Sequence, residues 1–284
     1  MLHKQRFIKI IGALVIVVVC VAFVGWLERT VFWQAAPGEQ SPAAPQQVDS
    51  QPTVAATKES IVADINKKLG RYAVSVTLSP VNNSTSYSTW SELTDSKQDV
   101  ADLQEFAGYL QTELSKYPID LVKNSNLQTI GIVRDLKVSG TSRPSVPVPT
   151  LNAMVYDAPQ EVSGGKDYAS SGISHEYWHF LDYRIRSDYR YTDPEWSTCN
   201  PAGFSYGGGG ETAYGNPDFK NAFYDRKGFV TEYSTYGIEE DRAEMFAWLM
   251  YVPDRVKNLD DAGIECKTKR LTEIVRTLSP QMSF

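Results

Sequence analysis

One five-residue motif constrains the local fold more than any other feature of the chain: His175-Glu176-Tyr177-Trp178-His179. Residues four apart lie on the same face of an α-helix, so a helix here would aim both imidazoles at one point. The flanks suit a buried helix, because Glu176 is the only Asp, Glu, Lys or Arg between Ala169 and Leu181. We therefore predict a helix over 170–183 that carries both histidines on one face.

This H-E-x-x-H spacing is typical of a zinc site in which each histidine binds the ion at about 2.0–2.1 Å. Glu176, next to the first histidine, is placed to act as general base toward a zinc-activated water. The chain has 3 histidines, none follows His179, and His3 lies ahead of an apolar segment. The third protein ligand is therefore expected to be a carboxylate. The alternative is a chance match on an ordinary helix.

A second helix is predicted over Ile238–Tyr251, with Glu240 and Glu244 one turn apart on one face. Buried carboxylates are costly unless they are paired or bind a metal. Glu240 as a zinc ligand and Glu244 as hydrogen-bond partner of a ligand histidine would account for both. The alternative is a solvated acidic face near the start of a helix, which suits Glu239 and Asp241 better than Glu244.

Together the two segments resemble the gluzincin zinc metallopeptidases. The run Thr231-x-Tyr233-x6-Glu240-x2-Ala243-Glu244-x-Phe246 is similar to the third-ligand region of the anthrax-toxin lethal factor catalytic domain and of the bacterial Pro-Pro endopeptidases. The resemblance implies an α+β, zincin-like fold with a small twisted sheet, an active-site helix and a third-ligand helix. It also implies an endopeptidase acting on peptide or protein substrates.

On this resemblance one zinc ion is bound by His175, His179 and Glu240. Glu176 is the general base, and Tyr233 donates a hydrogen bond to the substrate oxyanion. No G-x-M-E-N element is present, so an aminopeptidase of this class is not supported.

Three assignments around this site stay open at this point. Tyr236 is a rival to Tyr233, because it lies three residues closer to Glu240. Asp182, seven residues after His175 on the same helical face, is either a partner that orients an imidazole or an ordinary surface aspartate. The four glycines at 207–210 form either a mobile flap over a cleft or a plain surface loop.

The N-terminal part predicts a single-pass membrane protein. Residues 1–9 form a basic cytoplasmic tip, and residues 10–27 form an uninterrupted apolar transmembrane signal-anchor. Residues 28–59 are a flexible tether rich in Pro, Ala, Gln and Ser, which leaves 60–284 as an extracytoplasmic metallopeptidase domain. The alternative is a cleaved signal peptide, which would make the domain secreted.

The remaining features narrow the class of protein. The net charge is −6 and no basic cluster follows the N-terminal tip, so the sequence does not support binding of nucleic acid. Cys199 and Cys266 either form one disulfide or remain unpaired. We predict a helix over 97–116 and strands over 127–138 and 151–156, the last as an edge strand beside the cleft.

Two functions from other classes compete with the endopeptidase. One is a zinc-stabilised, non-catalytic surface module that binds peptide or cell wall. The other is a zinc hydrolase of another bond, such as a cell-wall amidase. The intact Glu176 counts against the first, because a purely structural zinc site does not require a general base.

Overall fold

The computed structural model describes residues 56–79, 88–215 and 226–284. The predicted cytoplasmic tip (1–9), the transmembrane segment (10–27) and most of the tether (28–59) lie outside these residues. Within them, no helix has both the length and the apolar character needed to cross a membrane. The first helix already begins at Lys58, because Thr57 and Ser60 cap its start reciprocally through side chain and backbone.

Helices and strands are mixed along the chain, as an α+β fold requires. Their order is α1 (Lys58–Leu69), η1 (Gly70–Tyr72), β1 (Ser75–Thr77), β2 (Ser88–Ser91), α2 (Lys97–Leu114), α3 (Ile119–Ser125), β3 (Thr129–Val138), β4 (Thr141–Ser142), β5 (Ser145–Val148), η2 (Pro149–Leu151), β6 (Ala153–Asp157), α4 (Ala158–Ser163), α5 (Lys166–Arg186), α6 (Pro194–Thr198), η3 (Gly210–Gly215), η4 (Tyr233–Thr235), α7 (Ile238–Tyr251), α8 (Pro253–Lys257) and α9 (Ala262–Val275).

The sheet is organised around β3, which agrees with the strand predicted over 127–138. The first half of β3 pairs in parallel with β1 and β6, and its second half pairs antiparallel with β2 and β4. Asp135 has a φ of 54° close to the point where the partners change. One strand thus joins a parallel and an antiparallel part of the sheet.

The edge strand beside the cleft is β5, so the prediction of an edge strand over 151–156 is wrong in its position. Ala153–Asp157 form β6, which lies between β3 and β5. All side chains of β6 are buried, as in an interior strand. Pro147 in β5 cannot donate a ladder hydrogen bond, and an edge position is one of the few that tolerates it.

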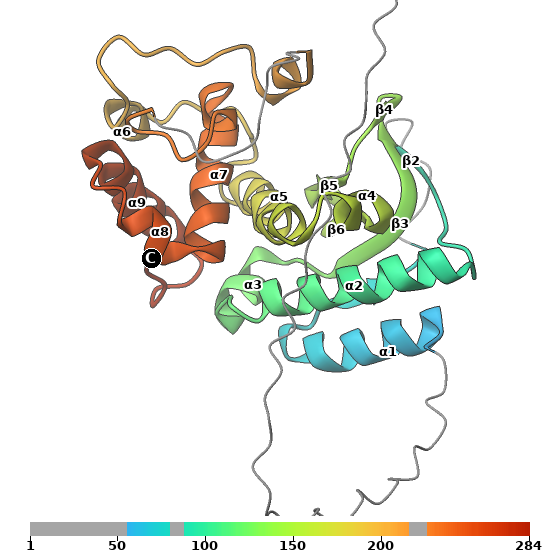
Figure 1. Ribbon diagram of the computed structural model, residues 1–284. Helices are drawn as coiled ribbons and strands as arrows, with labels where there is room; N and C mark the ends of the chain where they lie inside the picture. Colours follow the sequence, from blue (N-terminus) through green and yellow to red (C-terminus); the bar gives the residue numbers. More distant parts are fainter. Residues whose placement is uncertain (1–55, 80–87, 216–225) are drawn as a thin grey trace, which may run out of the picture. The chain divides into compact units, whose positions relative to one another are not determined.

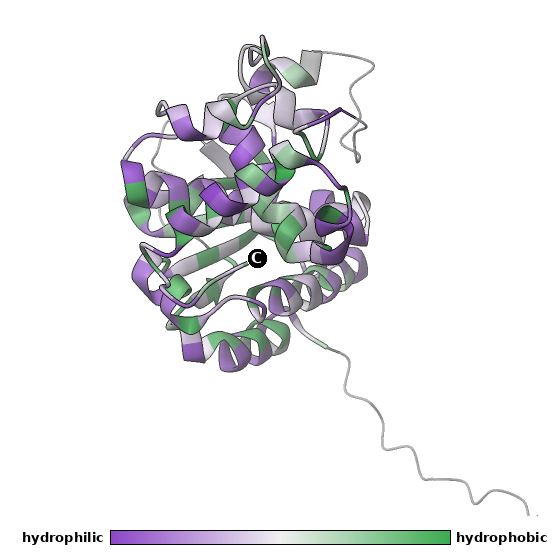
Figure 2. Cartoon of the chain, turned by 90° about the vertical axis from the view of Figure 1, so that its left-hand side faces the viewer, coloured by the Kyte–Doolittle hydropathy of each residue, from purple (hydrophilic) through white to green (hydrophobic). Residues whose placement is uncertain are grey.

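The helix α5 lies at the centre of the domain, between the strands and the C-terminal helices α7, α8 and α9 (Figure 1). It packs on β5, β6 and α2 and, most extensively, on α7. The centre of the Trp178 ring, which belongs to the five-residue motif, lies 5.3 Å from the centre of the Phe246 ring of α7. Along the outer helices apolar and polar residues alternate (Figure 2). By contrast, α7 buries most of its residues, and α5 buries nearly half of them, all between Ala169 and Asp182.

The three predicted helices are confirmed. The 97–116 segment forms α2, the 170–183 segment falls within α5, and Ile238–Tyr251 has the predicted bounds of α7. Pro253 begins the separate short helix α8. Helical spacing, of apolar residues in the first helix and of the two histidines in the second, thus predicts these elements correctly.

A disulfide and a buried ion pair attach α9 to the rest of the domain. Cys199 and Cys266 are bonded, with a Cα–Cα distance of 5.5 Å, which decides between the two possibilities that the sequence left open. The next residue, Lys267, is fully buried and its Nζ lies 2.6 Å from Oδ2 of Asp241. Because Asp241 directly follows Glu240, this ion pair fixes the first turn of α7.

Candidate metal centre

His175 and His179 lie on one face of α5, as the four-residue spacing predicts. Their Nε2 atoms are 3.0 Å apart, and their rings meet edge to face at 79°. Both side chains are largely buried, with 11% and 12% of their surface exposed. Two ring nitrogens are thus aimed at one small volume.

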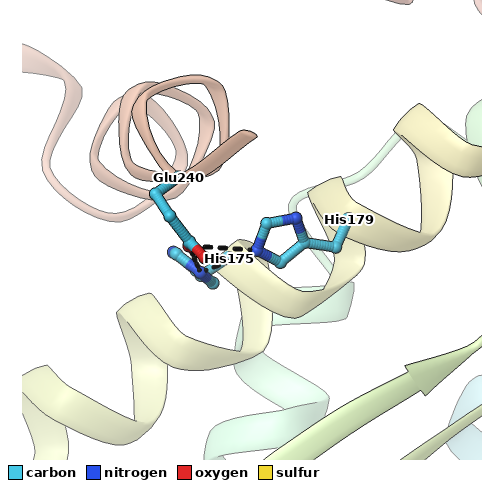
Figure 3. A group of neighbouring side chains, drawn as sticks. All are labelled: His175, His179 and Glu240. Atoms are coloured by element: carbon cyan, nitrogen blue, oxygen red, sulfur yellow. Dashed lines mark hydrogen bonds and ion pairs between the residues drawn. The ribbon is translucent and has the colours of Figure 1, made fainter. Parts of the chain in front are cut away.

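Glu240, in the first turn of α7, brings a carboxylate to the same point. Its Oε2 lies 3.1 Å from Nε2 of His175 and 3.3 Å from Nε2 of His179. Figure 3 shows the three side chains converging from the two helices. In the described part of the chain, these residues are the one group of three or more His, Cys, Asp or Glu whose geometry could hold a metal ion.

The donor set and the spacing fit zinc. Two imidazoles and one carboxylate are the ligands of many catalytic zinc sites. Tetrahedral ligands with bonds of about 2.0–2.1 Å lie about 3.3 Å from one another. The separations of 3.0, 3.1 and 3.3 Å are close to that value. Three protein ligands leave one coordination position open, which distinguishes a catalytic site from a closed structural one.

Glu244, one turn after Glu240, lies behind His175. Its Oε1 is 2.7 Å from Nδ1 of His175, and its Oε2 accepts hydrogen bonds from Thr231 Oγ1 at 2.8 Å and from Trp248 Nε1 at 3.0 Å. The carboxylate is therefore held at both oxygens. A hydrogen bond at Nδ1 places the imidazole proton there and leaves Nε2 as the metal-facing nitrogen.

The charges of the site favour a cation at its centre. Burial lowers the pKa of His175, but hydrogen bonds to Glu240 and Glu244 outweigh burial and raise this pKa well above its ordinary value. For Glu240, burial acts to raise the pKa, and the facing His179 and His175 hold it well below its usual range. A divalent cation would take the place of the proton that these carboxylates stabilise.

Glu176 lines a cavity of about 290 Å³ together with His175, His179, Glu240 and Tyr233. Its Oε1 accepts a hydrogen bond of 3.2 Å from the Ser145 hydroxyl of the edge strand β5. The general base that the sequence predicts therefore faces the same space as the three candidate ligands.

Tyr233 lines the cavity, and Tyr236 is not among the lining residues in the described part of the chain. The Tyr233 ring stacks on His175, with the ring centres 5.8 Å apart. Its hydroxyl and the Glu240 carboxylate both lie beside Gly210. This position favours Tyr233 over Tyr236 as the tyrosine that can reach a bound substrate.

The glycine run at 207–210 is hydrogen-bonded to the η4 segment and ends beside the candidate site. Gly207 N donates to Thr235 O at 3.1 Å and Gly209 N donates to Tyr236 O at 2.8 Å, so the run is bonded to η4. A Cβ at position 210 would overlap Glu240 Oε1 and the Tyr233 hydroxyl. Glycine is therefore required where the chain passes closely over the candidate site.

Asp182 has a different partner from the one suggested by the sequence. It is fully buried, and its Oδ2 accepts a 2.9 Å hydrogen bond from Nε of Arg242, which is fully buried as well. No hydrogen bond joins it to an imidazole in the described part of the chain, and it is not exposed to solvent. Arg242 follows Glu240 by two residues and Asp182 follows His179 by three, so the ion pair joins the two helices that carry the candidate ligands.

Sequence reasoning missed several residues of the cavity, including Ser145, Glu161 and Arg190. Ser145 comes from a short edge strand, and Glu161 from the short helix α4. Arg190 pairs with Glu239 at 3.2 Å, which gives that neighbour of Glu240 a separate partner. No motif or periodicity marks these positions, because only the fold brings them to the site.

Comparison with known proteins adds little to this description. No protein-family model and no curated protein matches the chain. A proposed zinc-binding metallo-peptidase from Bacteroides caccae has a similar crystal structure, with 12% sequence identity and a TM-score of 0.45, covering 78% of this chain and 88% of that one. At that score the likeness does not assign the fold, so the site stands on its own side chains.

Proposed function

We propose that this protein is a zinc-dependent endopeptidase of the gluzincin type. The observation that carries the proposal is the convergence of His175, His179 and Glu240 in the wall of the cavity that also holds Glu176. A structural zinc site would need the three ligands and a fourth, but not a carboxylate base beside an open position. Buried ligands with hydrogen-bonded partners also favour a site built for an ion over a chance cluster.

The residues divide the chemistry among them. When bound, zinc would act as a Lewis acid that acidifies a water and polarises the scissile carbonyl. Glu176 takes a proton from the attacking water and delivers it to the leaving amine. Tyr233 donates a hydrogen bond to the oxyanion as its charge develops. Glu244 keeps the proton of His175 on Nδ1, so that Nε2 remains a ligand.

Replacing the base separates catalysis from metal binding. Glu176→Gln should lower peptide hydrolysis by about 100-fold or more, because a positioned general base contributes that much. Its zinc content should stay equal to that of the wild type, since Glu176 is not a ligand. Hydrolysis retained by this variant would contradict the mechanism. Zinc without hydrolysis in the wild type would favour the non-catalytic module.

The class of bond is tested with two substrates. A mixed peptide library and purified peptidoglycan, each analysed by mass spectrometry after incubation, distinguish an endopeptidase from a cell-wall amidase. We expect internal cleavage of peptides. Release of peptides from glycan strands, with the library intact, would instead identify the amidase.

We further propose that the domain lies outside the cytoplasm on a single membrane anchor. The apolar run at 10–27 with its basic flank supports the anchor. The Cys199–Cys266 disulfide supports an oxidising compartment. The full-length chain should sediment with membranes, and protease added to intact cells should degrade its catalytic domain. Recovery in the cytosolic fraction would contradict this placement.

A further inference from the structure

A second buried glutamate lies in the wall of the cavity that holds Glu176. Glu161, in α4, is 1% exposed and lines this cavity. Neither of its carboxylate oxygens has a hydrogen-bond partner among the residues that the structure describes. A charged carboxylate without partners is costly to bury, so the state of this side chain requires an explanation.

Glu161 fills a space that α5 leaves open one turn before Glu176. Gly172 and Glu176 are four residues apart and share a helical face, and a Cβ at position 172 would lie 3.5 Å from Oε2 of Glu161. From β5, the Ser145 hydroxyl donates to Oε1 of Glu176 at 3.2 Å. The same hydroxyl is close enough to Glu161 to influence its ionisation. Ser145 therefore lies close to two carboxyl groups.

The single proton of Ser145 determines how it can bond to both. A hydroxyl has one hydrogen to donate and two lone pairs that accept. Because its hydrogen is directed to Glu176, Ser145 can bond to Glu161 only as an acceptor. Glu161 must then carry a proton of its own.

The surrounding charges favour the same form. Burial, followed by the charge of Glu176 on α5, raises the pKa of Glu161 well above its usual value. Asp157, at the end of β6, acts in the same direction. The Ser145 hydroxyl and, more weakly, His175 act to lower this pKa, but both effects are smaller than those of burial and of Glu176, and the net pKa is raised. Glu161 is thus surrounded by more negative than positive charge.

We propose that Glu161 is a positioning residue for Glu176, acting as a neutral carboxylic acid through Ser145. Once protonated, it can donate a hydrogen bond to Oγ of Ser145, which a charged carboxylate cannot do because it only accepts. Ser145 in turn donates to Oε1 of Glu176. This chain fixes one oxygen of Glu176 and leaves Oε2 to face the reacting water. The inference rests on the proposed function to the extent that Glu176 is the base.

Kinetics on the full-length protein distinguish a role of Glu161 as hydrogen-bond donor from a role that depends only on the size of its side chain. Glu161→Met has a similar size but no donor, and Ser145→Ala breaks the link. Each should lower kcat by about tenfold or more with little change in KM, and the double variant should be no worse than either single one. Glu161→Gln can still donate through its amide, so its kcat should stay within about threefold of the wild type. Equal losses in the Gln and Met variants, or a loss confined to KM, would overturn the proposal.

An infrared measurement tests the protonation state without any need for activity. The carbonyl stretch of a neutral carboxylic acid should be present in the wild type at neutral pH and lost in Glu161→Gln. Glu113→Gln is the matched control, because Glu113 is a buried glutamate on α2 that pairs with Lys116 away from the cavity. This control should keep the Glu161 band.

The two readouts distinguish failure of the inference from failure of the proposed function. Absence of the Glu161 band, in a protein that hydrolyses peptides, would overturn the inference and leave the function standing. The band without peptide hydrolysis would support the hydrogen-bonded chain and contradict the endopeptidase.

Discussion

Replacing Glu244 by glutamine tests whether the hydrogen bond behind His175 controls zinc binding. The carboxylate accepts from Nδ1 of His175 at 2.7 Å and from Thr231 and Trp248 at 2.8 and 3.0 Å. An amide has a donor end and an acceptor end, so it cannot satisfy both sides. With its nitrogen toward Trp248, two N–H donors face each other.

The opposite orientation of the amide is worse for the metal. With its nitrogen toward His175, the amide donates to Nδ1, and the imidazole proton must move to Nε2, the proposed ligand atom. A hydrogen bond to a charged group contributes about 1.5–3 kcal/mol. We therefore expect Glu244→Gln to weaken zinc binding by about 10- to 150-fold.

Competition with a chromogenic chelator, at fixed pH, measures this change. Glu239→Gln is the matched control, because Glu239 lies next to Glu240 in the same buried turn but pairs with Arg190. Its zinc affinity should stay close to that of the wild type. An affinity of folded Glu244→Gln within about threefold of the wild type would refute the reasoning.

Three further changes follow from the same contacts. Gly210→Ala should weaken zinc binding by about 1–3 kcal/mol, because the new methyl group would overlap the carboxylate of Glu240, the proposed ligand. Gly70→Ala is the control, since a Cβ there meets open space and zinc binding should not change; competition with a chelator compares the two. Asp182→Asn leaves the buried Arg242 charge without its partner and should lower the free energy of unfolding by about 3–5 kcal/mol. Its melting temperature should then fall by about 6–20 °C, and a shift below about 2 °C would contradict this role. Burial raises the pKa of Glu161 above its unfolded value of about 4.5. Between the unfolded and the folded pKa the folded state binds more protons than the unfolded state, so the free energy of unfolding falls as the pH rises through this range. Glu161→Gln should remove this loss, so its melting temperature should exceed that of the wild type at neutral pH, and the gap should close near pH 4; a gap independent of pH would contradict it.

Local spacing made the helices of the candidate site predictable. His175 and His179 are four residues apart, and so are Glu240 and Glu244; this spacing predicts that each pair shares one helical face. The structure brings both pairs together because α5 and α7 bury apolar residues against each other, as in the contact between Trp178 and Phe246. Period and burial were thus enough for these elements.

Contacts between distant segments could not be read in the same way. Asp182 lies on the face of the two histidines, but its partner Arg242 is 60 residues away, and spacing along one helix cannot reveal it. The strand over 151–156 was found, but its place in the sheet depends on the pairing of β5, a short strand with two valines and a proline. Glu161 carries no signal at all, since its role depends on Ser145 and Gly172.

Metal content tests the central claim most directly. Elemental mass spectrometry on the purified full-length protein should find close to one zinc per chain in the wild type and in Glu239→Ala, and almost none in Glu240→Ala. Circular dichroism would confirm that each variant is folded. A folded wild type without zinc, zinc retained by Glu240→Ala, or zinc lost with Glu239→Ala instead would contradict a centre made of His175, His179 and Glu240.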